Sequence, residues 1–576
     1  MKNILIYTLI LISGICIYSC DDNLLDTKPL DKFSEVDVWN DVNLAQGFIY
    51  NTYGSVMRGL IKNPEDGWPD VGAGVDDFTD NITLSGNNIV AKDQMDKYYD
   101  AGWNSFGTIR QCNLIIEKVD ASAKFSEKES KELIAQGKML RAMIYFSKAR
   151  IFGKYIIVDK VLTPEDDLKL PRTSTIKATY DFILKDLADA ADGLPTDAAT
   201  GQLTKGAALA LRAEVALQGA AYIETGKADY YQIAKDASEQ LFALGKYELD
   251  NDYANLFNNY DHALGSKEII LALFKNKDVT TFMDTPMQMI VSNCDATKNF
   301  PWVTPQLVES FEGWAGRWPS NELVNDYLVV DNDNVAKKWN ETSYYNKFVA
   351  TGGFVSKAIY FNRDKRFYAS MVYDSTRFFN NLVTIRKGGN MHWESNKDGN
   401  WAMTHSGYYF RKGVYESVKL WNSDHTPYHQ IVLRLGRSYL NYAEAMLRLN
   451  DPDKAIEYIN KTRTVHGGLP ELSAGISVDD IWKYYKIERR VDLFYENDRY
   501  WSLLRWGKES GSIIIPELNS GQTCIEIGAD GKSFNIIPLP ISKVENERVF
   551  STKRYLFPVP ENERLLNGNL DQNPGW

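Results

Sequence analysis

Residues 436–459 read GRSYLNYAEAMLRLNDPDKAIEYI, and this stretch decides the fold. Its apolar residues recur at helical spacing in two arms, and the Asn-Asp-Pro segment at 450–452 separates the arms with residues that favour a turn. Ala443 in the first arm and Ala455 in the second are small enough to let two antiparallel helices approach closely. The stretch therefore predicts a helical hairpin.

The hairpin also fits a known repeat. When Gly436 is taken as the first position of a unit of about 34 residues, Tyr439 and Ile459 fill the large apolar positions and the two alanines fill the small ones. This is the tetratricopeptide pattern, although Thr462 and Gly467 miss its last two positions. The alternative is a helical hairpin of no particular repeat family.

Helical periodicity extends over much of the chain. Residues 204–245 resemble a degenerate second copy of the repeat with a longer turn. Further helices are predicted from residue 36 and over 94–119, 128–153, 175–192, 203–223, 228–244, 431–449, 452–465 and 478–506. Residues 59–90 are rich in Gly, Asp, Asn and Pro and are predicted to form a loop.

The middle of the chain has a different character. Over residues 246–425 the helical spacing fades, glycine, asparagine and aromatic residues increase, and short apolar runs such as 268–274 suit buried strands. The sequence thus predicts a mainly α fold: a scaffold of tetratricopeptide-type helical hairpins with an irregular, loop-rich lobe that contains a few short strands. We expect helical regions over 36–245 and 426–576, the lobe over 246–425, and one compact fold over 36–576.

Composition excludes several classes of protein. The chain has 576 residues, of which 44% are hydrophobic and 24% charged, as in ordinary folded proteins and unlike disordered chains or many-helix membrane proteins. The formal net charge of -11, without a basic cluster, makes nucleic-acid binding a poor hypothesis. Aromatic residues make up 12% of the chain, which is the unusual number in its composition.

The N-terminus is predicted to be a processing segment. Residues 1–19 carry one lysine and then an apolar run that ends at Ser19-Cys20, which resembles a bacterial lipoprotein cleavage box. Cys20 is then the lipidated residue and 20–35 a tether, while Asp21 and Asp22 resemble the surface-export signal of Bacteroidetes lipoproteins. The alternatives are an ordinary signal peptide cut elsewhere and an uncleaved anchor.

Sequence motifs give no support for catalysis or cofactor binding. The chain has no GxGxxG, Walker or GxSxG motif, and Pro427 between His425 and His429 disfavours a helical zinc site. We therefore predict no enzyme activity, no metal and no cofactor. A glycosidase pair of carboxylates stays open as a minor alternative, because such a pair needs proximity in space and no fixed spacing in sequence. Three cysteines remain after Cys20, namely Cys112, Cys294 and Cys524, and an odd number leaves at least one free thiol, expected to be buried.

Several segments together resemble the SusD/RagB family of Bacteroidetes outer-membrane nutrient-binding lipoproteins. The segments are 109–118, 136–153, 204–208, 362–367, 433–445, 488–506, 555–560 and 572–576. The chain departs from the usual pattern at Gly436 (usually alanine), Arg437 (glutamate), Asn497 (glycine) and Ser502 (aspartate), and at Lys365, which is commonly proline. These departures put local ion pairs in doubt and leave the resemblance intact.

The resemblance implies both a fold and a function. It implies four tetratricopeptide units with a loop-rich lobe, in a lipid-anchored protein at the surface of the outer membrane. Such proteins act as lids on a SusC-like TonB-dependent transporter, capture an oligosaccharide, or a peptide in the RagB branch, and do no chemistry. A tetratricopeptide scaffold that binds other proteins is the second functional class, but it would need neither Cys20 nor exposed loop tryptophans.

Binding of a sugar requires exposed rings for its apolar face and polar side chains for its hydroxyl groups. Two predicted loops supply both: 64–81 and 299–327. The candidate ligand-binding residues are Trp68, Asp76, Asp77, Trp302, Trp314, Arg317 and Trp318. A third stretch, 391–410, is a weaker candidate. The alternative is that these rings pack beneath the irregular lobe.

Overall fold

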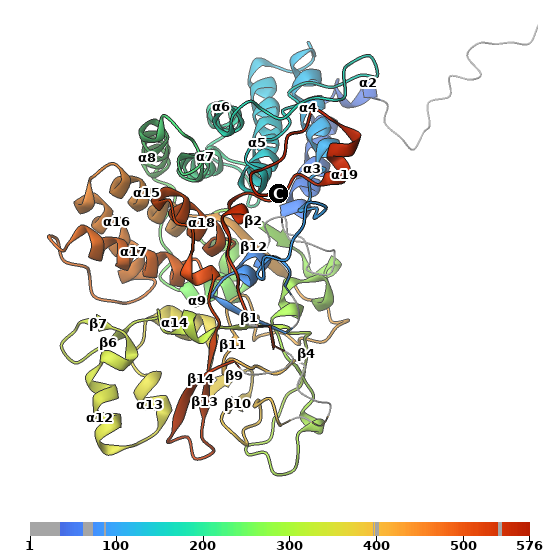
Figure 1. Ribbon diagram of the computed structural model, residues 1–576. Helices are drawn as coiled ribbons and strands as arrows, with labels where there is room; N and C mark the ends of the chain where they lie inside the picture. Colours follow the sequence, from blue (N-terminus) through green and yellow to red (C-terminus); the bar gives the residue numbers. More distant parts are fainter. Residues whose placement is uncertain are drawn as a thin grey trace, which may run out of the picture.

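The computed structural model describes residues 35–60, 73–85, 88–395, 397, 402–539, 544–545 and 547–576. Within this part of the chain, the long helices form the upper half of the molecule in Figure 1, and the short strands and loops form the lower half together with several short helices. The long helices are α3 (Val42–Leu60), α4 (Phe106–Asp120), α5 (Glu127–Phe152), α6 (Ile176–Gly193), α7 (Lys205–Ala220), α8 (Lys227–Ala243), α15 (Leu435–Arg448), α16 (Pro452–Val465), α17 (Val478–Asp492) and α18 (Arg499–Ser510). The predicted fold class, mainly helical with a few short strands, is confirmed.

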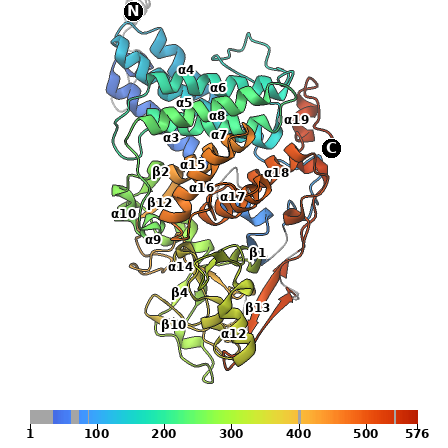
Figure 2. The same ribbon diagram turned by 90° about the vertical axis from the view of Figure 1, so that its left-hand side faces the viewer.

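Helices that follow one another in sequence pack against one another. Contacts join α4 to α5, α5 to α6, α6 to α7 and α7 to α8, and then α8 to α15 and α15 to α16, so that the C-terminal hairpin continues the N-terminal layer (Figure 2). Local sequence sets the ends of these helices. Ser126 and Glu129 form a reciprocal capping box at the start of α5, and Thr204 caps α7.

The hairpin predicted from residues 436–459 is confirmed as α15 and α16. Ala443 and Ala455 are fully buried, as expected of small residues where two helices meet. Asn450 adopts a left-handed conformation in the turn, Asp451 accepts a hydrogen bond from the backbone N–H of Lys454, and Pro452 occupies the first turn of α16. The local chemistry of the turn thus explains why one helix ends and the next begins there.

Four predicted boundaries were wrong. The helix predicted over 94–119 begins only at Phe106, the first residue of α4. Residues 431–434, expected at the start of a helix over 431–449, belong instead to strand β12 (Tyr428–Arg434), which pairs antiparallel with β2 (Ile269–Lys275). The helix predicted over 478–506 breaks into α17 and α18. Part of the loop predicted over 59–90 forms β1 (Ile82–Ser85), which lies between β5 (Arg317–Pro319) and β15 (Val544–Glu545). In the two strand cases, pairing with a distant segment outweighs local preference.

The loop-rich part is built from short elements. Its other strands are β3 (Asn293–Cys294), β4 (Phe311–Glu312), β6 (Val329–Val330), β7 (Ala336–Lys337), β8 (Met371–Val372), β9 (Thr376–Phe378), β10 (Asn381–Val383), β11 (Tyr409–Phe410), β13 (Thr523–Ile527) and β14 (Phe534–Pro538). Its short helices include α9 (Tyr253–Asn258), α10 (Tyr260–Gly265), α11 (Asn321–Val324), α12 (Ser343–Thr351), α13 (Val355–Ile359) and α14 (Lys365–Ser370), while α2 (Glu35–Val38) and α19 (Glu561–Leu566) lie in the helical half. These elements enclose a hydrophobic core of their own, separate from the core of the helices.

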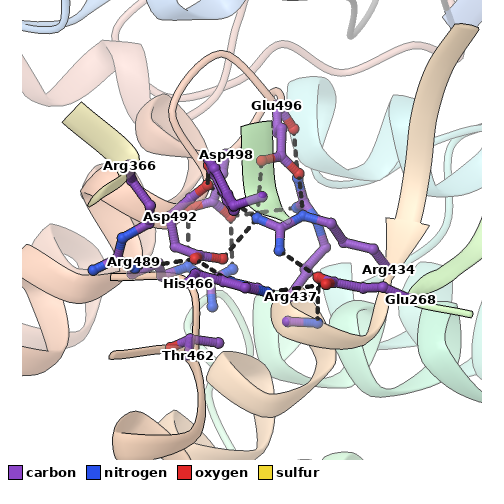
Figure 3. A network of polar contacts seen from close by, with 12 residues as sticks. Glu268, Arg366, Arg434, Arg437, Thr462, His466, Arg489, Asp492, Glu496 and Asp498 are labelled. Atoms are coloured by element: carbon purple, nitrogen blue, oxygen red, sulfur yellow. Dashed lines mark hydrogen bonds and ion pairs between the residues drawn. The ribbon is translucent and has the colours of Figure 1, made fainter. Parts of the chain in front are cut away.

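A buried network of charges joins the two halves of the molecule (Figure 3). Arg434, at the junction of β12 and α15, contacts Glu268 at 2.8 Å, Asp492 at 2.6 Å and Glu496 at 2.7 Å. Arg366 on α14 contacts Asp364, Glu488 and Asp492. Since the network spans β12, α14 and α17, it fixes the position of the helices relative to the loop-rich half.

The departures at 436, 437 and 502 belong to this network and its surroundings. Arg437 contacts Glu214 and Asp498 and donates to the Glu496 carbonyl, so its charge is paired. Ser502 lies between Arg489 and Asp498. A Cβ atom at Gly436 would lie 2.3 Å from Arg434 Nη1, so alanine would displace that guanidinium. Arg437 is therefore paired with carboxylates in this chain, and Ser502 takes part through hydrogen bonds.

His466 gives the network a testable pH dependence. It contacts Asp492 through Nδ1 at 2.7 Å and Glu268 through Nε2 at 2.9 Å, and all three side chains are fully buried. Burial alone would lower the pKa of His466, but the two carboxylates outweigh it and raise the pKa to about 9. The protonated form is thus favoured by folding.

We expect the stabilisation that His466 provides to be complete below about pH 6.5, the pKa of an unfolded histidine, and to disappear as the pH rises through about 9. The measurement is urea unfolding of the wild type and His466→Gln at several pH values. The difference in unfolding free energy between them should shrink by about 1.4 kcal/mol per pH unit within this window. A constant difference from pH 6 to pH 9.5 would contradict a charged His466.

Candidate functional site

The three tryptophans of the stretch 299–327, which was predicted to be a loop, lie in different surroundings in the structure. Residues 295–310 connect β3 to β4, which pair antiparallel, and Trp302 lies within this connection. Trp314 follows β4, and Trp318 lies in β5. The exposed fractions are 56% for Trp302, 47% for Trp314 and 0% for Trp318. Two of the three rings are thus open to solvent.

Trp318 requires a correction. Its ring is buried in the core of the loop-rich half and lies edge-on to His405, with the ring centres 5.2 Å apart. The cause is the pairing of β5 with β1, which places Trp318 opposite Thr83 and inside the fold. A ring without solvent exposure cannot serve as the ligand platform that the sequence suggested.

Arg317, Asp76 and Asp77 also differ from expectation. Arg317 Nε contacts Asp77 Oδ2 at 2.7 Å, and both side chains are largely buried. Asp76 accepts hydrogen bonds from Asn81 Nδ2 at 3.2 Å and the Tyr495 backbone N–H at 2.8 Å. Burial raises the pKa of Asp76 to about 7. These three residues are therefore engaged in contacts inside the fold, and the structure does not present them on an exposed sugar-binding loop.

Other candidates are only partly described. Trp68 and Trp401 lie outside the described residues, as does Cys20. In the weaker stretch, 391–410, Trp393 is half-buried beside His405 and the tyrosines at 408 and 409 are buried. Trp302 stacks on Phe300, with ring centres 5.4 Å apart and planes at 11°, and its loop contacts residues 388 and 395. The exposed ring of Trp302 thus forms a pair with Phe300. The segments that hold this pair in place are not those that hold Trp314.

Trp314 is positioned by a close backbone approach. The N–H groups of residues 313, 314 and 315 donate to the carbonyls of Ser292, Gln288 and Val291. A Cβ atom at Gly313 would lie 1.8 Å from the Val291 oxygen, so only glycine permits this contact. The indole of Trp314 is thereby held outward on a backbone that is fixed on one side.

A second exposed ring lies on the adjoining segment. Trp421 is 42% exposed, and its neighbours bind the segment that carries Trp314: the N–H of Glu312 donates to the Leu420 carbonyl, and the N–H of Asn422 donates to Glu312 Oε2 at 2.9 Å. We name Trp314 and Trp421 the tryptophan platform. Two half-exposed indoles on hydrogen-bonded segments can receive the apolar faces of a ligand.

Polar groups surround the tryptophan platform. Asn422 accepts a hydrogen bond from Gln288 Nε2 at 3.1 Å and donates from its backbone to Glu312, which is half-buried. Met283 is half-exposed and lies next to Asn422, because the Met283 N–H donates to the Asn422 carbonyl. A carboxylate, an amide and a thioether beside two rings suit a ligand with both hydroxyl groups and apolar faces.

Sequence reasoning missed Trp421. Its only local signal is a large ring followed by the turn-forming residues Asn422, Ser423 and Asp424, which is typical of an exposed loop. Nothing in the sequence connects it to Trp314.

Within the described ranges, no group of three or more His, Cys, Asp or Glu side chains is arranged to hold a metal ion. Cys112, Cys294 and Cys524 are free and buried, as expected. None of the described helices combines the length and apolar character needed to cross a bilayer.

Comparisons with known proteins give a consistent result. The family model described as "SusD family" matches residues 267–576, and the model described as "Starch-binding associating with outer membrane" matches residues 73–217. A SusD-like protein of Formosa agariphila is 22% identical over 550 residues, covering 88% of this chain and 92% of the relative.

Solved structures agree in fold. A SusD-like protein from Bacteroides fragilis superposes with a TM-score of 0.74 at 23% identity, covering 96% of this chain and 100% of the other. A SusD-like carbohydrate-binding protein from the same species gives a TM-score of 0.72 at 19% identity, covering 93% and 100%. Because the first family model alone matches more than half of the residues, the chain belongs to the SusD family.

Proposed function

We propose that the protein binds a glycan through the tryptophan platform and delivers it to a SusC-like TonB-dependent transporter at the outer membrane. The observation that carries the proposal is the placement of Trp314 and Trp421, both half-exposed, on segments whose backbones are hydrogen-bonded to each other. Membership of the SusD family supports it. Further support comes from the second matching model, whose description refers to starch binding, and from one structural neighbour that is described as a carbohydrate-binding protein.

The proposed role is binding without chemical change. The experiment uses protein that lacks residues 1–20, a glycan array and a parallel peptide panel, followed by titration calorimetry with the tightest ligand. We expect saturable binding of a glycan and its unaltered recovery after prolonged incubation. Exclusive capture of peptides would contradict the glycan assignment. A hydrolysis product that disappears on substitution of a single Asp or Glu would contradict binding without catalysis.

Attachment to the membrane is proposed to depend on Cys20. Cys20→Ala should move the protein from the outer-membrane fraction to the soluble fraction, because acyl chains on that residue would supply the anchor. Fractionation followed by immunoblotting measures this. Substitution of Asp21 and Asp22 by asparagine should keep the protein in the membrane fraction but protect it from protease added to whole cells. Continued digestion of that variant would contradict an export role for the acidic pair.

A further inference from the structure

A groove lies where the helical hairpin α15–α16 meets the loop-rich half. One part, of about 700 Å³, is lined by residues of α9, α14 and the segment 411–417. An adjoining part, of about 510 Å³, is lined by residues of α16 and by Tyr247 and Tyr439. Asn251 lines both parts, so they meet at this residue, and we refer to the two together as the groove. Helices α15, α16, α9 and α14 follow one another down the face shown in Figure 2.

The lining of the groove is polar and carries no excess of positive charge. In the larger part, Lys365 and Arg411 are equalled in number by Asp252 and Glu416, and Arg411 is paired with Glu416 at 2.8 Å. His466 also lines this part, but its charge is paired with Glu268 and Asp492. The smaller part contains three glutamates and one lysine. Five asparagines and four tyrosines also line the two parts. This chemistry favours a neutral ligand rich in hydroxyl groups and disfavours an anionic one.

Three side chains of the groove are available to a ligand. Within the described part of the chain, the side chains of Asn251, Lys365 and Ser417 make no hydrogen bond or ion pair, and all three are exposed. Lys365 occupies the first position of α14, where proline would fit the helix well. Its backbone N–H donates to the Gly467 carbonyl, and its side chain places an unpaired ammonium in the groove.

The groove is continuous along the chain with the tryptophan platform. Residues 411–417 form one of its walls, and Trp421 follows Ser417 by four residues, so their Cα atoms lie at most about 14 Å apart. The Gly413 N–H donates to Asn258 Oδ1 at 2.8 Å, which ties this segment to α9. One backbone segment therefore supports a wall of the groove at one end and an exposed indole at the other.

We infer that the ligand is an extended, neutral oligosaccharide chain: one end stacks on Trp314 and Trp421, and the following sugar units lie in the groove against Asn251, Lys365 and Ser417. The inference rests on the proposed glycan-binding function and adds the length and charge of the ligand. It makes the groove a second binding region that selects long chains over short ones.

The test compares chain lengths. The probes are the oligosaccharides of two to eight sugar units derived from the glycan that binds most tightly on the array, titrated into wild type, Asn251→Ala/Lys365→Ala and Trp421→Ala. In the wild type, the longest probe should bind at least tenfold more tightly than the disaccharide. The groove variant should lose roughly tenfold in affinity for the long probe and keep its affinity for the disaccharide, since it lacks two hydrogen-bonding groups. Trp421→Ala should weaken the binding of both.

Asn51→Ala/Lys128→Ala is the matched control, because both residues are exposed and lie on helices α3 and α5. It should bind like the wild type, and thermal melts should show that all variants are folded. Equal affinity for short and long probes, or a groove variant that binds the long probe normally, would overturn the inference while leaving glycan binding intact. A uronic or sulfated glycan as the tightest ligand would also overturn it. If the protein binds no glycan at all, the proposed function itself is wrong.

Discussion

Replacing Arg434 by methionine is expected to lower the free energy of unfolding by about 3–5 kcal/mol. The guanidinium contacts Glu268, Asp492 and Glu496, none of them more than 4% exposed in the side chain. Its loss leaves three carboxylates in a region of low dielectric constant without their common partner, and each of them is then costly to keep charged. Urea unfolding followed by tryptophan fluorescence measures the change.

Two comparisons make this prediction specific to the buried charges. Lys177→Met breaks an exposed pair with Asp181 and should cost less than about 1 kcal/mol. In the double variant Arg434→Met/Glu496→Met the loss should be less than the sum of the two single losses, since one orphaned carboxylate is removed with its partner. A loss below about 1 kcal/mol for Arg434→Met, or strict additivity in the double variant, would show that the network does not hold the two halves together.

Removing the tryptophan platform is expected to have the largest effect on binding. Trp314→Ala and Trp421→Ala should each weaken glycan affinity roughly tenfold, because stacking adds about 0.5–1.5 kcal/mol to the burial of the ring. The double variant should bind on the order of a hundredfold more weakly than the wild type. Both rings are half-exposed, so the melting temperature should change little. Calorimetric titration and thermal melts on the same samples test both statements.

Trp318→Ala is the control with the opposite pattern. Its ring is buried against His405, so truncation should cost about 3–5 kcal/mol of stability while the folded fraction retains its affinity. Trp302→Ala tests whether the Phe300–Trp302 pair also belongs to the site. If Trp314→Ala and Trp421→Ala both leave affinity unchanged and Trp302→Ala lowers it, the ligand binds on the 295–310 loop and the tryptophan platform has no role.

The sequence alone determined the helical scaffold. Ala443, Ala455 and the turn at 450–452 predicted the hairpin α15–α16, and the helix predicted over 128–153 forms as α5 between the Ser126 cap and Gly153. These features depend on residues three or four positions apart, or on a cap and its adjacent turn, so they can be recognised without knowledge of the rest of the chain.

Only the tertiary structure decided which residues are available to a ligand. Trp302, Trp314 and Trp318 occur in one Gly- and Pro-rich stretch, yet the pairing of β5 with β1 buries Trp318, and Asp77 takes up Arg317. Trp421 joins Trp314 because residues 420–422 are hydrogen-bonded to Glu312. The exposure of a side chain depends on which distant segments pair with its backbone, and local sequence does not contain that information.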